Sequence, residues 1–211
     1  TSAKEGVNFR PELNRLTTIG DFAFSRTAQS SVSLPDSVTT VGEQAFSEST
    51  ALTSFHIGAG VTSFAETALY NDRKIATLTA SADNPVYSAE HNVLYRKADD
   101  GLHLMLSPAA NTLTDYTVRA GTVEIGASAF ANNKTLTRVV LPDGLKVIGD
   151  DAFAGTTALT ELVIPESVER SSGVTGNSLE LVEYGSKVTS IRMEGSWVPM
   201  PRRIVVRGGV D

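Results

Sequence analysis

Apolar residues return along this chain at a fixed spacing. An aliphatic residue and Gly are followed by two variable residues and then by Ala-Phe. This anchor ends at Phe24, Phe46, Phe130 and Phe153, and a degenerate copy ends at Leu69. Copies that follow one another directly lie 22 or 23 residues apart. Such a period predicts a solenoid, in which each coil buries its apolar face only against the adjacent coils.

A second pattern follows each anchor: Leu, two variable residues and then alternating apolar positions. The clearest copies are 52–57, 136–141 and 159–164, and Pro closes the last two. Alternation is the period of a strand with one buried face, and Pro lacks the amide hydrogen that would continue a ladder. The Ala-Phe segment suits a short helical turn. We therefore expect one short parallel strand and one short helical segment per coil, with the strands stacked in one narrow sheet.

Two regions depart from the repeat. In residues 81–118, Asn84-Pro85 marks a turn, and two apolar runs then flank Asp99-Asp100-Gly101. Apolar runs around an Asp-Gly turn predict a β-hairpin, so we expect a hairpin insert near 84–106. Residues 166–211 lose the anchor but keep strand patterns at 179–184 and 204–206. Because terminal repeats must cap an open core, we interpret this region as divergent C-terminal coils or a cap.

The segment Leu34 to Phe46, with its sister copies, resembles the BspA-type leucine-rich repeat family of bacterial cell-surface proteins. Residues 84–87 and 91–95 loosely match an insert that is common in that family. The resemblance implies an α/β leucine-rich-repeat solenoid, right-handed and of about eight coils, that covers residues 1–211 as a single domain. It also implies an extracellular location on a bacterial surface and a role in adhesion. The chain shows neither a signal peptide nor an anchor, so we interpret it as a fragment of a longer protein.

Composition and charge narrow the classes of partner. A hydrophobic content of 41% with 20% charged residues is ordinary for a folded chain. The net charge of −6 argues against nucleic acid, whose phosphates require a basic surface. The chain has no cysteine, which excludes disulfides and thiolate metal sites. No apolar run approaches the 18 residues of a membrane span, so we expect no direct membrane insertion.

No pattern of residues indicates catalysis, a cofactor or a metal. His56, His91 and His103 lack the spacing of metal ligands, and no Ser lies in a Gly-x-Ser-x-Gly motif. The acidic residues near 99–100 and 143–151 lack the spacing of a calcium loop, and turn or capping roles suit them better. We therefore expect a protein that is not an enzyme, with no cofactor and no metal site.

Two isolated features leave alternatives open. Asn133-Lys134-Thr135 is a formal N-glycosylation acceptor, although one tripeptide arises easily by chance. Trp197 is the only tryptophan. It suits a plug at the end of the solenoid core, with an exposed aromatic contact for a sugar or a partner as the alternative.

The exposed face of the predicted sheet is the candidate binding surface. Alternation turns two residues of each strand outward, and stacking would align them in two columns. Merely solvated strand residues would show the same pattern, but neighbouring exposed aliphatic side chains can mark a contact patch. The candidate residues are Ser54, His56, Thr77, Thr79, Arg138, Val140, Glu161, Val163, Leu181 and Glu183.

Two functions are consistent with these features. One is a non-catalytic interaction or adhesion module that binds a protein or glycan of a host matrix, a host cell or a neighbouring cell through the exposed sheet face. The other is a structural spacer or stalk within a larger surface protein, with no ligand of its own. We expect a monomer in either case.

Overall fold

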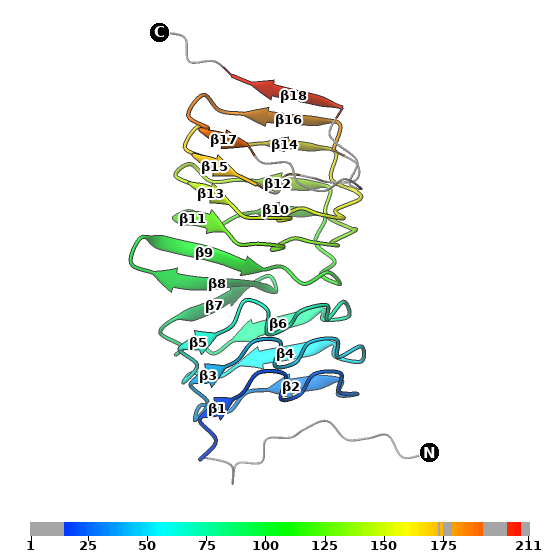
Figure 1. Ribbon diagram of the computed structural model, residues 1–211, viewed down its shortest axis with the longest axis vertical. Coiled ribbons are helices and arrows are strands. Elements are labelled where there is room, and N and C mark those ends of the chain that lie inside the picture. The colour runs from blue at the N-terminus through cyan, green and yellow to red at the C-terminus, as the bar shows by residue number, and fades with distance from the viewer. Residues whose placement is uncertain (1–14, 173, 175–178, 192–201, 208–211) are drawn as a thin grey trace. The chain divides into compact units, whose positions relative to one another are not determined.

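The computed structural model describes residues 15–172, 174, 179–191 and 202–207 (Figure 1). The chain forms a β-solenoid of about eight coils. It divides into two compact units: unit 1 lies within Thr1–Lys97 and Pro108–Ala110, and unit 2 lies within Ala98–Ser107 and Asn111–Asp211. Trp197, with its predicted role as a core plug, lies outside the described residues.

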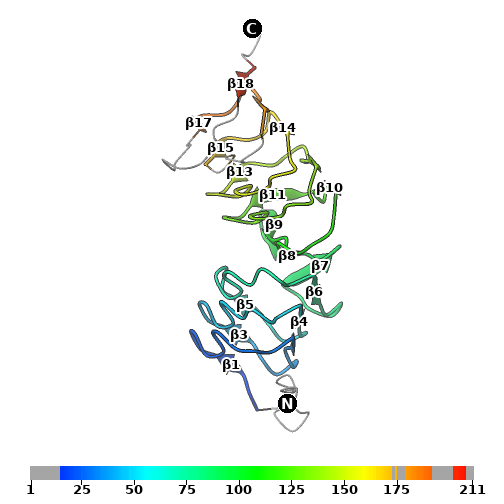
Figure 2. The ribbon, with the colours of Figure 1, turned by 90° about the vertical axis from the view of Figure 1, so that its right-hand side faces the viewer.

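Unit 1 contains two parallel ladders, which Figure 2 shows as separate stacks. Both ladders have three strands, one from each of three successive coils. The short-strand ladder comprises β1 (Thr18–Ile19), β3 (Thr40–Val41) and β5 (Ser63–Phe64). The long-strand ladder comprises β2 (Ser31–Ser33), β4 (Ser54–Ile57) and β6 (Thr77–Ala80).

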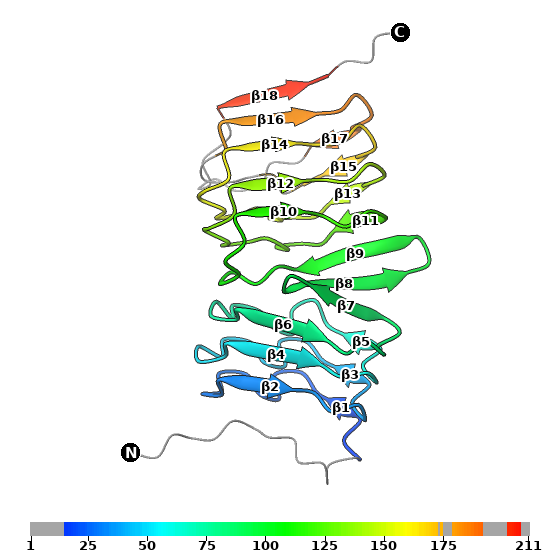
Figure 3. The ribbon, with the colours of Figure 1, turned by 180° about the vertical axis from the view of Figure 1, so that it is seen from behind.

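Unit 2 repeats the arrangement with two strand positions per coil (Figure 3). Its short-strand ladder is parallel and comprises β9 (Gly101–Leu106), β11 (Thr122–Ile125), β13 (Val147–Ile148), β15 (Arg170–Ser171) and β17 (Ser190–Ile191). The long strands are β10 (Asp115–Thr117), β12 (Arg138–Val140), β14 (Glu161–Val163), β16 (Leu181–Tyr184) and β18 (Arg203–Val206). The predicted strands at 179–184 and 204–206 are thus confirmed at β16 and β18.

The prediction of one strand and one helical segment per coil, stacked in one sheet, is wrong: each regular coil contributes two strands to separate ladders, and the described residues contain no helix. The Ala-Phe segment is a run of turns in which Gln44 and Ser128 take positive φ values of 51° and 55°. Every second amide leaves its own coil: Phe130 N–H donates to the Ala152 carbonyl of the next coil at 2.8 Å. The intervening amides close local turns, as when Ala131 N–H donates to the Ser128 carbonyl at 3.0 Å. Bonding to the next coil therefore replaces the i to i−4 bonds that a helix would need.

The Ala-Phe residues nevertheless fill the core as the repeat predicts. Phe46 and Phe130 are each about 1% exposed. In unit 1, Phe24 stacks on Phe46 with ring centroids 5.3 Å apart, and in unit 2, Phe130 stacks on Phe153 at 5.2 Å. Burial of one such ring contributes roughly 1.5–3 kcal/mol, so the anchors hold adjacent coils together.

The anchor glycine permits this close stacking. A Cβ atom on Gly42 would lie 2.7 Å from the Asp21 amide nitrogen in the preceding coil. A Cβ on Gly149 would lie equally close, at 2.7 Å, to the Ala127 nitrogen. The recurring Gly is therefore explained by the distance between coils, since neither glycine has a positive φ.

A hairpin lies within the predicted insert. β7 (Tyr87–Glu90) pairs antiparallel with β8 (Val93–Ala98) around His91 and Asn92. These two residues have φ values of 51° and 63°, as a tight two-residue hairpin turn requires. This turn at His91-Asn92 lies upstream of the Asp99-Asp100-Gly101 position at which the sequence predicted a hairpin turn. The runs on either side of Asp99-Asp100 also form strands, β8 and β9.

In unit 1, side chains of the insert bond to the last regular coil, where a further regular coil would otherwise stack. The Asn84 amide donates to the carbonyls of Gly58 at 2.7 Å and Val61 at 3.0 Å. Its oxygen accepts from the amides of Val86 and Tyr87 at 2.9 and 2.6 Å. The Tyr87 hydroxyl accepts from Phe64 N–H at 2.9 Å. These bonds satisfy backbone groups of the last regular coil, where the Gly58 carbonyl has only one other partner, the Val61 amide at 3.4 Å.

Candidate functional site

In unit 1, the candidate residues lie opposite one another on the long-strand ladder. Ser54 is paired in register with Thr77, and His56 with Thr79. None of these side chains is buried. The His56 Nδ1 and Thr79 Oγ1 atoms lie 2.9 Å apart, so hydrogen bonding between coils already occupies part of this face.

In unit 2, the candidate residues also form columns. Arg138 lies opposite Asp115, and Val140 lies opposite Thr117 on the neighbouring strand β10. On β14 and β16, Glu161 lies opposite Leu181, and Val163 lies opposite Glu183. All six candidates are at least partly exposed, and Val163 is 60% exposed. The structure thus places the predicted residues on one exposed face of each unit, while their role in binding stays a prediction.

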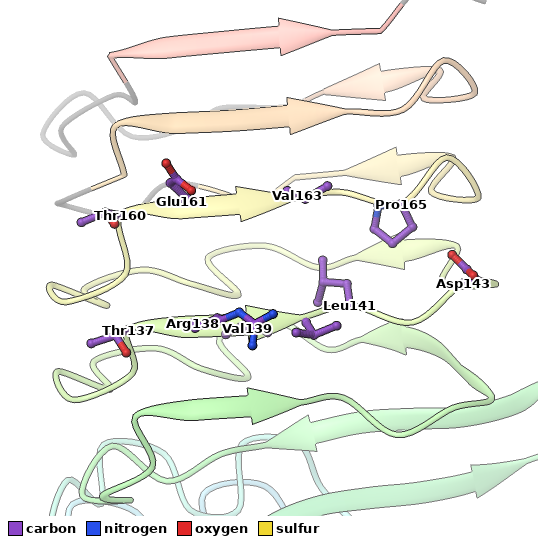
Figure 4. A pocket seen from close by; sticks show the side chains of 10 residues that line it. Thr137, Arg138, Val139, Leu141, Asp143, Thr160, Glu161, Val163 and Pro165 are labelled. Atoms are coloured by element: carbon purple, nitrogen blue, oxygen red, sulfur yellow. The ribbon is translucent and has the colours of Figure 1, made fainter.

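A hollow of about 470 Å³ lies over β12 and β14 (Figure 4). Its volume falls within the range of small-ligand pockets. The candidates Arg138, Val140, Glu161 and Val163 line it. Figure 4 shows Thr137 and Thr160 at one end of the two strands and Leu141 and Pro165 at the other. Polar side chains are therefore at one end of the hollow, and the other end combines apolar side chains with the carboxylate of Asp143.

The long-strand ladder is open at this hollow. β10 pairs with β12, and β14 pairs with β16 and β18, but no backbone hydrogen bond joins β12 to β14 in the described part of the chain. The same two coils stay bonded elsewhere, because β11 pairs with β13 and Phe130 N–H reaches the next coil. The coils therefore separate on the long-strand side alone. This leaves backbone groups of Val139 and Val163 without ladder partners.

The opening is explained by prolines at the same position of two successive coils. Pro142 closes β12, and Pro165 follows β14 at the equivalent place in the next coil, 23 residues later. In unit 1 that place holds Pro35 and then Gly58, and a Cβ on Gly58 would lie only 2.5 Å from the Leu34 carbonyl oxygen. Pro165 carries a Cβ and a ring, so it cannot approach Pro142 as closely as Gly58 approaches Pro35.

The other described junctions of the long strands are consistent with this explanation. Where β16 stacks on β14, Gly185 follows Pro165, and its added Cβ would lie 2.3 Å from the Glu166 Cα. Where β12 stacks on β10, Pro142 follows Arg119. The ladder is closed at both places. Among these junctions, only the open one, between β12 and β14, has Pro at this position in both coils.

Within the described part of the chain, the charged candidates at the hollow have no charged partner. Elsewhere, successive coils pair their exposed charges: Arg26 Nε lies 2.7 Å from Glu48 Oε2, and Lys146 Nζ lies 3.0 Å from Glu169 Oε1. Arg138 and Glu161 hold the same relation in sequence, but the contacts of the described residues include no ion pair or side-chain hydrogen bond for either. Both side chains are thus available to a ligand.

Sequence reasoning missed Thr137, Thr160, Leu141 and Pro165 as residues of the site. The outward alternation selects positions within each strand, whereas these residues flank the strands. A usable signal was present, because Pro142 and Pro165 close two consecutive repeats.

Other polar positions have local structural roles. Asn133 of the formal glycosylation acceptor is 0% exposed, and its oxygen accepts from the Leu136 amide at 3.1 Å. His103 has each ring nitrogen near a carboxylate: Nε2 is 2.9 Å from Asp100 and Nδ1 is 3.1 Å from Glu124. No cluster of three or more potential metal-ligating side chains was found in the described ranges. Across the same ranges, no helix is both long and apolar enough for a membrane span.

Comparison with known proteins gives matches to structures and to one family model. A leucine-rich repeat protein from Eubacterium ventriosum is 26% identical, with a TM-score of 0.71, over 83% of this chain and 47% of that one. A leucine rich cell surface protein from Faecalibacterium prausnitzii is 27% identical, with a TM-score of 0.67, over 86% and 58%. The pneumococcal vaccine antigen PcpA shares the fold at 19% identity and a TM-score of 0.62, over 82% and 55%. This chain thus spans about half the length of these proteins. No curated protein is matched.

The family model described as "BspA type Leucine rich repeat region" matches residues 12–96 and 109–194 in six copies. These ranges include the anchors at Phe24, Phe46, Phe130 and Phe153 and both long strands of the hollow. The chain therefore belongs to the BspA-type leucine-rich repeat family.

Proposed function

We propose that this chain is a non-catalytic interaction module, displayed on a bacterial cell surface, that binds a protein or glycan through the long-strand face of unit 2. The open ladder between β12 and β14 carries this proposal, because it combines an exposed hollow with unpaired charges and exposed aliphatic side chains. The description of the F. prausnitzii relative as a cell surface protein supports the location.

Arg138 and Val163 would have distinct roles in such binding. The guanidinium of Arg138 presents several donors to a carboxylate or to sugar hydroxyls. Val163, which is 60% exposed, offers apolar area at the other end of the hollow. The partner would be a macromolecule of a host matrix, a host cell or a neighbouring cell, and no reaction is expected.

The test is binding of the purified chain to immobilised matrix proteins and glycans at physiological salt. The double variant R138E/V163D is expected to lose saturable binding. The variant Y70D/R73E introduces the same charge changes at exposed positions of unit 1 and is expected to bind normally. Circular dichroism must first show that both variants are folded. Equal binding by R138E/V163D and the unmodified chain would contradict the proposed face.

A structural spacer is the second candidate, and the outward face of unit 1 favours it. Its ladder is closed, and its outward side chains are small or bonded to one another, as His56 is to Thr79. A spacer predicts that no member of the panel is retained. Hydrolysis of any glycan or peptide by the pure chain would contradict both candidates.

A further inference from the structure

The charges and apolar residues at the hollow are arranged so that the face complements itself. Arg138 on β12 and Glu161 on β14 occupy the same position along their strands, 23 residues apart. Val140 and Val163 are related in the same way, one step further along each strand. Each strand therefore presents one charged and one aliphatic side chain to solvent, and the two charges are opposite.

A second copy can be placed opposite this face by a two-fold axis that runs parallel to the strands, between β12 and β14. Rotation about this axis exchanges the positions of the two strands and keeps their direction. Arg138 of one copy then faces Glu161 of the second copy, and Glu161 faces Arg138. Val140 faces Val163 twice in the same way. Such an isologous contact makes every favourable pair twice.

The neighbouring strands do not oppose this register. Under the same rotation, Asp115 on β10 faces Leu181 on β16, and Thr117 faces Glu183, so no like charges meet on these two strands. Past the strand ends the same register brings Asp143 and Glu166 of the two copies towards each other, a like-charge pair that the central pairs must outweigh. An axis placed on β14 would set Glu161 against itself. Because packed sheets twist by about 30° relative to each other, contact would be concentrated on the central strands, where the complementary pairs lie.

We propose that the long-strand face of unit 2 associates with a second copy of this chain through this parallel, two-fold contact. The observation that carries the proposal is the unpaired, opposite charge of Arg138 and Glu161 beside the exposed Val163, with the partner surface being the same surface. The proposal does not depend on the ligand proposed above. It replaces the monomer expected from the sequence, and it implies that self-association and partner binding compete for one face.

The experiment is sedimentation equilibrium of the pure chain from micromolar to millimolar concentration, with no other macromolecule present. The unmodified chain is expected to show a reversible monomer–dimer equilibrium. Each single variant, R138E and E161R, places like charges opposite each other and is expected to raise the dissociation constant at least about tenfold. The control R73E, at an exposed position of unit 1, is expected to leave it unchanged.

A mixture of the two variants provides the decisive measurement. In a heterodimer of R138E with E161R, both central pairs join opposite charges, so the equal mixture is expected to dimerise as the unmodified chain does. The double variant R138E/E161R restores both pairs within one sequence and is expected to dimerise alone. An unmodified chain that stays monomeric at millimolar concentration, or a mixture that fails to associate, would overturn the proposal.

Its failure can be told apart from failure of the proposed function. Partner binding is measured at nanomolar protein, where the proposed dimer is dissociated. A monomeric chain that still binds a partner would overturn only the self-association. A dimer that binds no member of the panel would leave the self-association standing and contradict only the adhesion function.

Discussion

The long strands of unit 1 and those at the centre of unit 2 carry the same repeat pattern but form different surfaces. In unit 1, β2, β4 and β6 make a continuous ladder with small or mutually bonded outward side chains. In unit 2, the ladder is interrupted between β12 and β14, and the gap has a hollow and two unpaired charges. The difference is explained by the residue that closes the second coil, Gly58 in one case and Pro165 in the other.

This comparison shows how a solenoid can acquire a site without losing its repeat. Both junctions keep the anchor aromatic stack, with ring centroids 5.3 Å apart in unit 1 and 5.2 Å apart in unit 2. A larger closing residue separates the coils on one side only. The remaining sides hold the stack together while backbone and side-chain groups become available on the open side.

The largest expected effect comes from removing the Asn84 side chain, which caps backbone groups of the last regular coil in unit 1. N84A removes four hydrogen bonds and leaves the carbonyls of Gly58 and Val61 without their buried partner. We expect the free energy of unfolding to fall by roughly 3–5 kcal/mol, measured by urea denaturation. D83A, at the exposed neighbouring position, should change it by less than about 0.5 kcal/mol. A similar small loss for N84A would show that the cap is dispensable.

A second difference between the units is electrostatic. Asp72 is buried in unit 1 and accepts from Ser49 N–H at 2.6 Å, whereas the equivalent positions in unit 2 hold neutral Asn133 and Thr156. Burial raises the pKa of Asp72 to about 7, with a further contribution from the charge of Glu48 that also raises it. The folded chain therefore binds this proton more tightly than the unfolded chain does.

The expected result is that stability falls as pH rises from about 4 to about 7 and then levels off, because the acid ionises at lower pH in the unfolded chain. We expect this group to account for about 2–3 kcal/mol across that window. Urea unfolding at a series of pH values would measure it. D72N should remove this part of the slope, so an unchanged slope in D72N would assign the pH dependence to other groups.

Closing-residue substitutions test the comparison directly. G58A places a Cβ 2.5 Å from the Leu34 carbonyl oxygen, so the coils must separate or strain. We expect a loss of about 1–3 kcal/mol and faster amide exchange at Leu34, which donates to the His56 carbonyl across this junction. G20A is the matched control, because no atom lies within 4 Å of its added Cβ. Equal effects of the two substitutions would contradict the close-approach explanation.

The smallest change in stability is expected from the reverse substitution. P165G lets the β14 coil approach Pro142, so hydrogen bonds between β12 and β14 should form and partly offset the entropy that Gly adds to the unfolded chain. We expect stability to change by less than about 1 kcal/mol, with slower hydrogen exchange at the Leu141 and Val163 amides. Binding and self-association at the hollow should both decrease. Unchanged exchange at these amides would show that Pro165 does not open the ladder.

Sequence periodicity predicted the coil, the core anchors and the outward residues, because all three depend on regular spacing. It predicted the insert near 84–106 for the same reason, as an interruption of that spacing. It misjudged the Ala-Phe segment, because Ala and an aromatic residue at a turn are compatible with a helix when only local preference is considered. The backbone hydrogen bonds between coils, which decided the turn conformation, join residues that are 21 or 22 positions apart.

By itself, the sequence determined a leucine-rich-repeat solenoid with Phe46 and Phe130 in the core and Arg138, Glu161 and Val163 on the outer face. Only the tertiary structure decided that β12 and β14 separate and that Arg138 and Glu161 stay unpaired at a hollow. The physical reason is that strand alternation is a property of one coil. The distance between coils instead depends on which residue of the preceding coil lies against Pro165.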